Sequence, residues 1–84
     1  MICDDKQCYI CGRWQDIQIH HCLHGSMRKL ADEDGLTVYL CVRCHKELHD
    51  HGTHDKDLQR LAQYFYELAH TRAEFMKRYG KSFL

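Results

Sequence analysis

The chain of 84 residues contains no proline and no asparagine, and its formal net charge is zero. It has no apolar run long enough to span a membrane, so we expect no membrane partner. Its start, Met1-Ile2 followed by Asp4-Asp5, lacks the features of a signal peptide. Zero net charge argues against strong, indiscriminate nucleic-acid binding, but it does not exclude a local basic stripe. We therefore expect a cytoplasmic protein with reduced thiols.

Six cysteines and eight histidines are present in this short chain. A chain of this length is near the lower limit for a free-standing core and often needs a metal or disulfides. Reduced cysteines in Cys-x-x-Cys pairs indicate metal binding rather than disulfides. Two such pairs together predict a structural Zn²⁺ site with four sulfur ligands: Cys8, Cys11, Cys41 and Cys44. Of the two remaining cysteines, Cys3 is expected to be a spare thiol and Cys22 to pack as a small apolar group.

The hydrophobic pattern predicts one small α+β domain over residues 1–84. Alternation with Ile17 and Ile19 on one face predicts a strand over residues 15–20. Residues 1–7 are expected to be loose. Residues 23–35 are expected to form a loop that ends in an Asp34-Gly35 turn. A run of β-branched and aromatic residues predicts a second strand over residues 36–40.

Helices are predicted for the rest of the chain. One runs from Cys41 to about His51 and is stopped by Gly52. Apolar residues that recur every three and four positions predict a second helix over residues 57–70. The sequence from Thr71 to Glu74 is a capping box that opens a last short helix, which Gly80 ends.

Four histidines occupy special positions in this pattern. His20 and His21 are at the end of the first strand, where both can approach a common site from different angles. His45 and His49 are one turn apart on one helix face, a spacing at which two imidazoles can bind one ion. His51 and His54 are expected to be loop residues, although His51 is close enough in sequence to compete with His49.

This order of cysteine pair, strand, His-His, loop, strand, and cysteine pair merging into a helix resembles the HNH endonucleases of the ββα-metal group. The sequence from Ile19 to Leu48 and the C-terminal sequence from Arg72 are especially similar to small HNH-type proteins of phages and prophages. The resemblance covers the chain from Cys8 onward. It implies a zinc-stapled hairpin and helix core over residues 8–51, followed by two supporting C-terminal helices over residues 57–84.

The resemblance also implies a function, which is metal-dependent hydrolysis of phosphodiester bonds in DNA with low sequence specificity. His21 would be the general base, and one catalytic divalent ion (Mg²⁺, Mn²⁺, Ni²⁺ or Zn²⁺) would be bound by His20, His45 and His49. The nearest basic residues, which we expect to contact nucleic acid, are Arg28, Lys29, Arg43 and Lys46. Further partners would be a second copy of the chain or a phage or host protein, in the cytoplasm of a bacterial host.

The sequence departs from the HNH pattern at one position. Members of the family usually carry an asparagine that orients the base histidine, and here that position falls near Gly35-Leu36. We expect Asp34, Asp32 or a loop carbonyl to orient His21 instead. The missing asparagine and the zero net charge leave an alternative function, a catalytically weak or inactive zinc-stapled module that binds nucleic acid or protein. A thiol redox enzyme is disfavoured because both Cys-x-x-Cys pairs are assigned to zinc.

Overall fold

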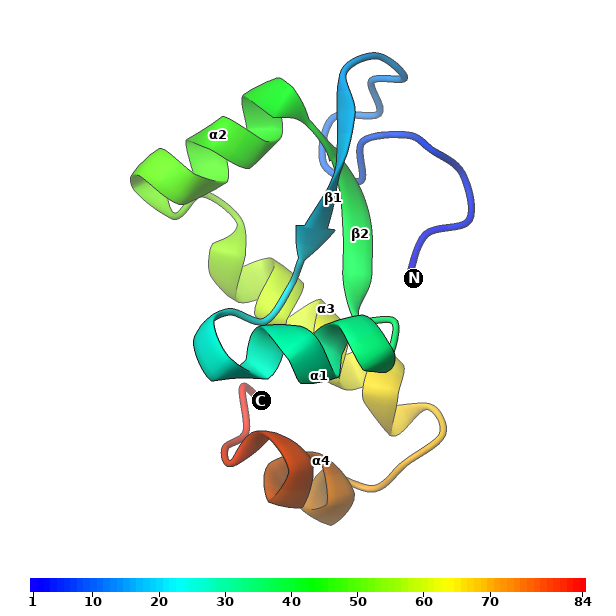
Figure 1. The fold of residues 1–84 in the computed structure, drawn as a ribbon, viewed down its shortest axis with the longest axis vertical. Coiled ribbons are helices and arrows are strands. Elements are labelled where there is room, and N and C mark those ends of the chain that lie inside the picture. The colour runs from blue at the N-terminus through cyan, green and yellow to red at the C-terminus, as the bar shows by residue number, and fades with distance from the viewer.

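The computed structural model describes all 84 residues as a small α+β fold with a two-stranded sheet and four α-helices (Figure 1). The elements in chain order are β1 (Ile17–His21), the 3-10 helix η1 (Gly25–Met27), α1 (Arg28–Glu33), β2 (Thr37–Cys41), α2 (Val42–His51), α3 (Asp55–Glu67) and α4 (Arg72–Tyr79). The predicted α+β class, the two strands and the helical C-terminal half are confirmed. No helix has both the length and the apolar character that crossing a bilayer requires.

The two strands pair antiparallel, with His20 opposite Val38 and His21 opposite Thr37. β2 is buried along most of its length, whereas β1 is buried mainly at His20. The strand that carries the histidine pair is therefore the more exposed of the two. Its last two residues lie beside two helices: His21 is next to Asp32 of α1, and His20 is next to His45 and His49 of α2.

The prediction of a loop over residues 23–35 is wrong. The connection between the strands folds as η1 and α1, with Ala31 buried against the core and Leu30 partly buried. The segment from Met27 to Glu33 contains mostly good helix formers, and this local preference together with burial of Ala31 explains the helix. The strands are thus joined through a helix that crosses the lower end of the sheet (Figure 1).

The C-terminal helices begin and end close to the predicted positions. Gly52 and Gly80 adopt left-handed backbone angles (φ 71° and 82°) and end α2 and α4. The capping box of α4 is present, with Thr71 Oγ1 accepting from the backbone of Glu74 and the Glu74 carboxylate accepting from the backbone of Thr71. α3 begins at Asp55, two residues earlier than predicted, and ends at Glu67, three residues earlier than predicted.

The buried apolar side chains form a core between the sheet, α1 and the C-terminal helices. Phe75 of α4 is fully buried and lies edge-on to Tyr66 of α3. The N-terminal residues form no helix or strand, but they are more anchored than expected. The Ile2 N–H donates to the Thr37 carbonyl at 2.8 Å, and the Ile2 side chain packs against the core.

Candidate functional site

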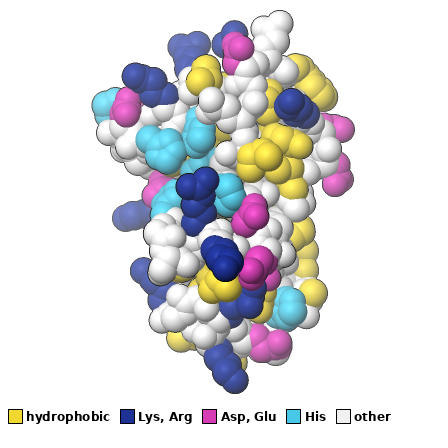
Figure 2. All heavy atoms as spheres, viewed as in Figure 1, with side chains coloured by type: hydrophobic (Ala, Val, Ile, Leu, Met, Phe, Trp, Pro, Cys, Tyr) yellow, Lys and Arg dark blue, Asp and Glu magenta, His cyan; other side chains and the backbone are white.

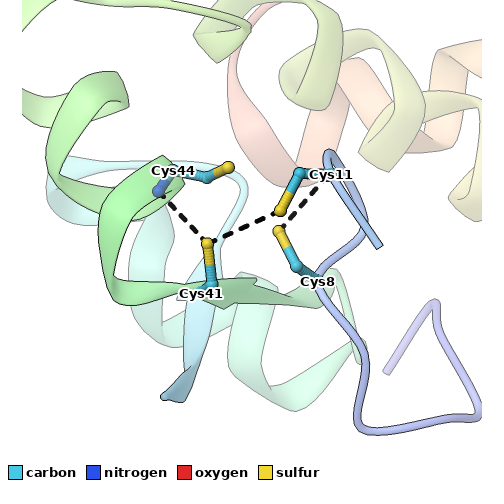
Figure 3. A group of neighbouring side chains, drawn as sticks. All are labelled: Cys8, Cys11, Cys41 and Cys44. Atoms are coloured by element: carbon cyan, nitrogen blue, oxygen red, sulfur yellow. Dashed lines mark hydrogen bonds between the residues drawn. The ribbon is translucent and has the colours of Figure 1, made fainter. Parts of the chain in front are cut away.

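The four cysteines of the two Cys-x-x-Cys pairs converge on one point (Figure 3). Cys8 and Cys11 come from the N-terminal loop, while Cys41 ends β2 and Cys44 lies in the first turn of α2. The four sulfur atoms all lie within 4.8 Å of one another, and Sγ of Cys11 is 3.7 Å from Sγ of Cys41. Tetrahedral zinc with bonds of about 2.3 Å places its sulfurs about 3.8 Å apart. The four cysteines therefore form a group that can hold a metal such as zinc.

Local backbone geometry brings each cysteine pair together. In the loop, Gly12 takes a left-handed conformation (φ 82°), and its N–H donates to the Cys8 carbonyl. Backbone N–H groups point at sulfur in both pairs, from Cys11 to Cys8 at 3.5 Å and from Cys44 to Cys41 at 3.4 Å. The second bond caps α2, so the partial positive charge at this helix end favours a thiolate.

The thiols of the group do not ionise alike. Burial opposes ionisation of Cys8, but hydrogen bonds from nearby backbone groups outweigh it and lower the pKa to about 6. Burial, together with the neighbouring cysteines, raises the pKa of Cys44. The Cys8 thiolate thus forms readily, whereas ionisation of Cys44 needs the stabilising charge of a bound cation. Cys22 is different, because it is fully buried in the core and burial raises its pKa to about 12, as expected for a cysteine that only packs.

A second polar site is a pocket of about 240 Å³ lined mainly by residues of β1 and α2, here called the histidine pocket. It is lined by Ile19, His20, His21, His24, Arg28, His45 and His49. One ligand atom each from His20, His45 and His49 lies within 4.8 Å of the others, and the Nε2 atoms of His45 and His49 are 3.0 Å apart. The structure thus brings the three predicted imidazole ligands together and places His21 beside them.

His20 is the buried member of this group, with 2% of its surface exposed. Its Nε2 atom has no hydrogen-bond partner, which is uncommon for a buried polar atom. Burial lowers the pKa of His20 to about 4, and His45, His24 and His49 add to the effect. A neutral imidazole with an unpartnered nitrogen is the form that binds a metal ion. The donor set therefore fits a divalent cation.

His45 is held in position by Gln18 of β1. The carboxamide oxygen of Gln18 accepts from Nδ1 of His45 at 2.7 Å, which leaves Nε2 of His45 facing His49. Burial and the neighbouring His49 lower the pKa of His45. Hydrogen bonds of this kind fix the tautomer and ring orientation of metal-binding histidines.

His21 pairs with Asp32 of α1. Because an ionised carboxylate only accepts, Nε2 of His21 donates to Oδ1 of Asp32, at 3.1 Å. In the neutral His21 ring, Nδ1 is then the nitrogen without a proton. Asp32 was one of three candidates for the group that orients His21. Asp34 instead lies at the end of α1, where Arg78 and Tyr79 of α4 donate to it.

The four basic residues expected to contact nucleic acid are not gathered at one place. Arg28 lines the histidine pocket, and Lys29 follows it on the exposed side of α1. Arg43 lines a different pocket, beside Cys41 and Cys44. Lys46 forms an exposed ion pair with Asp50 at 3.5 Å. Figure 2 shows Lys and Arg side chains next to the group of histidines on one face of the molecule.

Sequence reasoning missed two residues near the pocket, His24 and Asp55. Nε2 of His24 donates to Oδ1 of Asp55 at 2.7 Å, across 31 positions of sequence. No local pattern links them, since His24 precedes η1 and Asp55 opens α3. The prediction that His51 is a loop residue is wrong, because His51 is the exposed last residue of α2, and it belongs to neither imidazole group. His54 lies in the turn before α3, as predicted, and its side chain pairs with Asp57.

Comparison of the chain with protein-family models, with curated proteins and with solved structures finds no match.

Proposed function

We propose that this chain is an HNH-type endonuclease that hydrolyses phosphodiester bonds in DNA with one divalent ion bound in the histidine pocket. One observation supports this most: His20, His45 and His49 converge on one point, with His21 on the wall of the same pocket. Metal-assisted hydrolysis needs an ion and a base side by side. Histidines with a purely structural role would not need a fourth imidazole, that of His21, beside them with one ring nitrogen free of hydrogen bonds.

In this mechanism Nδ1 of His21 takes the proton of the attacking water, while Nε2–H stays bonded to Asp32. The Asp32 carboxylate holds the ring and stabilises the imidazolium formed after proton transfer. His20, His45 and His49 would hold the ion, which when bound polarises the scissile phosphate and stabilises the leaving oxygen. Arg28 lines the pocket wall and would bind a phosphate oxygen of the DNA.

The four-cysteine group has a supporting role in this proposal. A zinc with four sulfur ligands has no open coordination position, so it would be structural. Cys41 and Cys44 fix the first turn of α2, and the next residue, His45, enters the histidine pocket. Zinc bound there would therefore hold β2, α2 and the N-terminal loop in the arrangement that the pocket needs.

The test is plasmid cleavage with added Mg²⁺, Mn²⁺, Ni²⁺ or Zn²⁺ by the full chain and by His21→Ala. We expect the wild type to cleave, by nicking if the chain acts as a monomer, and the variant to lose at least about a hundredfold in rate, as befits a general base. His51→Ala is the matched control, because His51 is an exposed histidine of α2 outside the pocket. Equal rates for His21→Ala and wild type would refute the role of His21.

A second candidate function is a zinc-stapled binding module that cuts nothing. It is favoured by the neutral net charge and by Trp14, whose side chain is 63% exposed just after the first cysteine pair. The number of bound metal ions separates the two functions. One zinc and no ion at the histidines would favour the module, and a second ion would favour the nuclease.

A further inference from the structure

His24 and Asp55 form a short, partly buried pair at the edge of the histidine pocket. His24 Nε2 and Asp55 Oδ1 are 2.7 Å apart, and their side chains are 40% and 26% exposed. Neither residue belongs to the three-imidazole group. An ion pair would suffice to dock the start of α3 on the segment after β1, so the pair alone does not indicate a ligand.

The third member of this cluster is His20. One ligand atom each from His20, His24 and Asp55 lies within 4.8 Å of the others. His20 is buried, and its Nε2 has no hydrogen-bond partner. An ion pair between His24 and Asp55 leaves that nitrogen unsatisfied, whereas a cation bound among the three residues would satisfy it.

The two clusters that share His20 differ in chemistry. His20, His45 and His49 offer three imidazole nitrogens, a set that suits zinc, nickel and copper. His20, His24 and Asp55 offer two nitrogens and a carboxylate oxygen, which are better ligands for a harder ion such as Mn²⁺. A neutral imidazole has one free lone pair, so His20 can bond only one ion at a time.

We propose that His20, His24 and Asp55 form a second divalent-cation position that alternates with the three-imidazole position through the shared His20. The histidine pocket then binds one ion, and the kind of ion decides which position is filled. Manganese prefers the position with the carboxylate, and nickel prefers the three imidazoles. The inference rests on the proposed function only in taking the three-imidazole group as the site of the catalytic ion.

Titration with Mn²⁺ tests the proposal without nucleic acid, with the electron paramagnetic resonance signal of the free ion as the readout. The key protein is the full chain with His45→Ala and His49→Ala, in which only the new position is intact. We expect it to bind one Mn²⁺. Adding Asp55→Asn should weaken binding by more than about tenfold, because losing a residue that merely orients a metal ligand already costs about that much. Adding Asp57→Asn is the control, because Asp57 pairs with exposed His54 near the start of the same helix.

Absence of Mn²⁺ binding in a folded His45→Ala, His49→Ala chain that retains one zinc would overturn the proposal. So would equal effects of Asp55→Asn and Asp57→Asn. If the double variant does not fold, single Asp55→Asn in the otherwise native chain decides the matter. There the affinity for Mn²⁺ should fall by more than about tenfold relative to the affinity for Ni²⁺, and an equal fall for both ions would refute the proposal. These titrations are independent of cleavage, so failure of the nuclease assay would leave them interpretable.

Discussion

His21 at the end of β1 donates through Nε2 to Asp32 of α1, and the 3.1 Å bond leaves Nδ1 of the ring free. In the proposed mechanism, this bond holds the neutral His21 ring in the tautomer that a general base needs. Asp32→Asn should therefore lower the single-turnover cleavage rate by about tenfold or more, with little effect on DNA affinity. Quenched-flow cleavage and DNA-binding titrations measure the two effects. Asp50→Asn, a carboxylate of α2 that pairs with Lys46, is the control; a matching loss in both variants would point to a general charge effect.

Gln18 orients one of the three imidazoles in the same pocket. Gln18→Leu removes the acceptor for His45 Nδ1 and frees the ring to rotate. We expect about a 10- to 100-fold loss of affinity for the ion at the histidines, with the zinc content unchanged. Isothermal titration with Ni²⁺ measures the loss. Gln15→Leu, at an exposed position just before β1, should bind Ni²⁺ as the wild type does.

The four-cysteine group should carry much of the stability of the fold. Cys44→Ser removes one sulfur ligand, and in small zinc modules the metal contributes on the order of 10 kcal/mol to folding. We expect zinc loss, a large fall in helical circular dichroism, and the same outcome when the wild type is treated with a strong chelator. Cys3→Ser lies outside the group and should keep one zinc per chain. A Cys44→Ser chain with normal zinc content and melting temperature would contradict this.

Acid should destabilise the ion-free histidine pocket. The pKa of His20 is about 4 in the fold, against about 6.5 in an unfolded chain. Between these values the unfolded chain binds a proton that the folded chain lacks, so the free energy of unfolding falls as pH decreases from 6.5 to 4. Urea denaturation at several pH values measures the slope. His20→Gln, which removes the titrating imidazole, should have a shallower slope than the wild type.

The capping box of α4 offers a test of the supporting part of the fold alone. Thr71→Ala removes the side-chain acceptor for the N–H of Glu74. It should cost about 1 kcal/mol, which corresponds to roughly 4–8 °C in melting temperature for a domain of this size. Lys77→Ala, at an exposed position of the same helix, should change it little. Because α4 lies outside the histidine pocket, the cleavage rate at 25 °C should be unchanged in both variants.

Local signals in the sequence predicted much of this fold. The two Cys-x-x-Cys pairs, the spacing of His45 and His49, the capping box at Thr71 and the stop at Gly52 each depend on neighbours within a few residues. Short-range geometry fixes such features, so they can be read without a structure. The helix α1 was not predicted, although most of its residues are good helix formers. Its six residues make too few turns to show a clear apolar period.

Contacts between distant segments could not be predicted in this way. The pair of His24 and Asp55 depends on how α3 docks beside the end of β1, and the bond from Gln18 to His45 depends on the angle between β1 and α2. Asp32 faces His21 only because the inter-strand segment is helical. In each case packing of the whole chain decides which polar groups meet.

The short helix α2 carries Cys44 and His45 as consecutive residues, one toward each polar group. Oxidation of the cysteines should therefore also disturb the position of His45 in the histidine pocket. A disulfide between Cys41 and Cys44, or between either of them and a cysteine of the N-terminal loop, would release a zinc ion bound there and loosen the first turn of α2. Peroxide should then abolish the proposed DNA cleavage without modifying an imidazole, and a thiol reductant supplied with zinc should restore it.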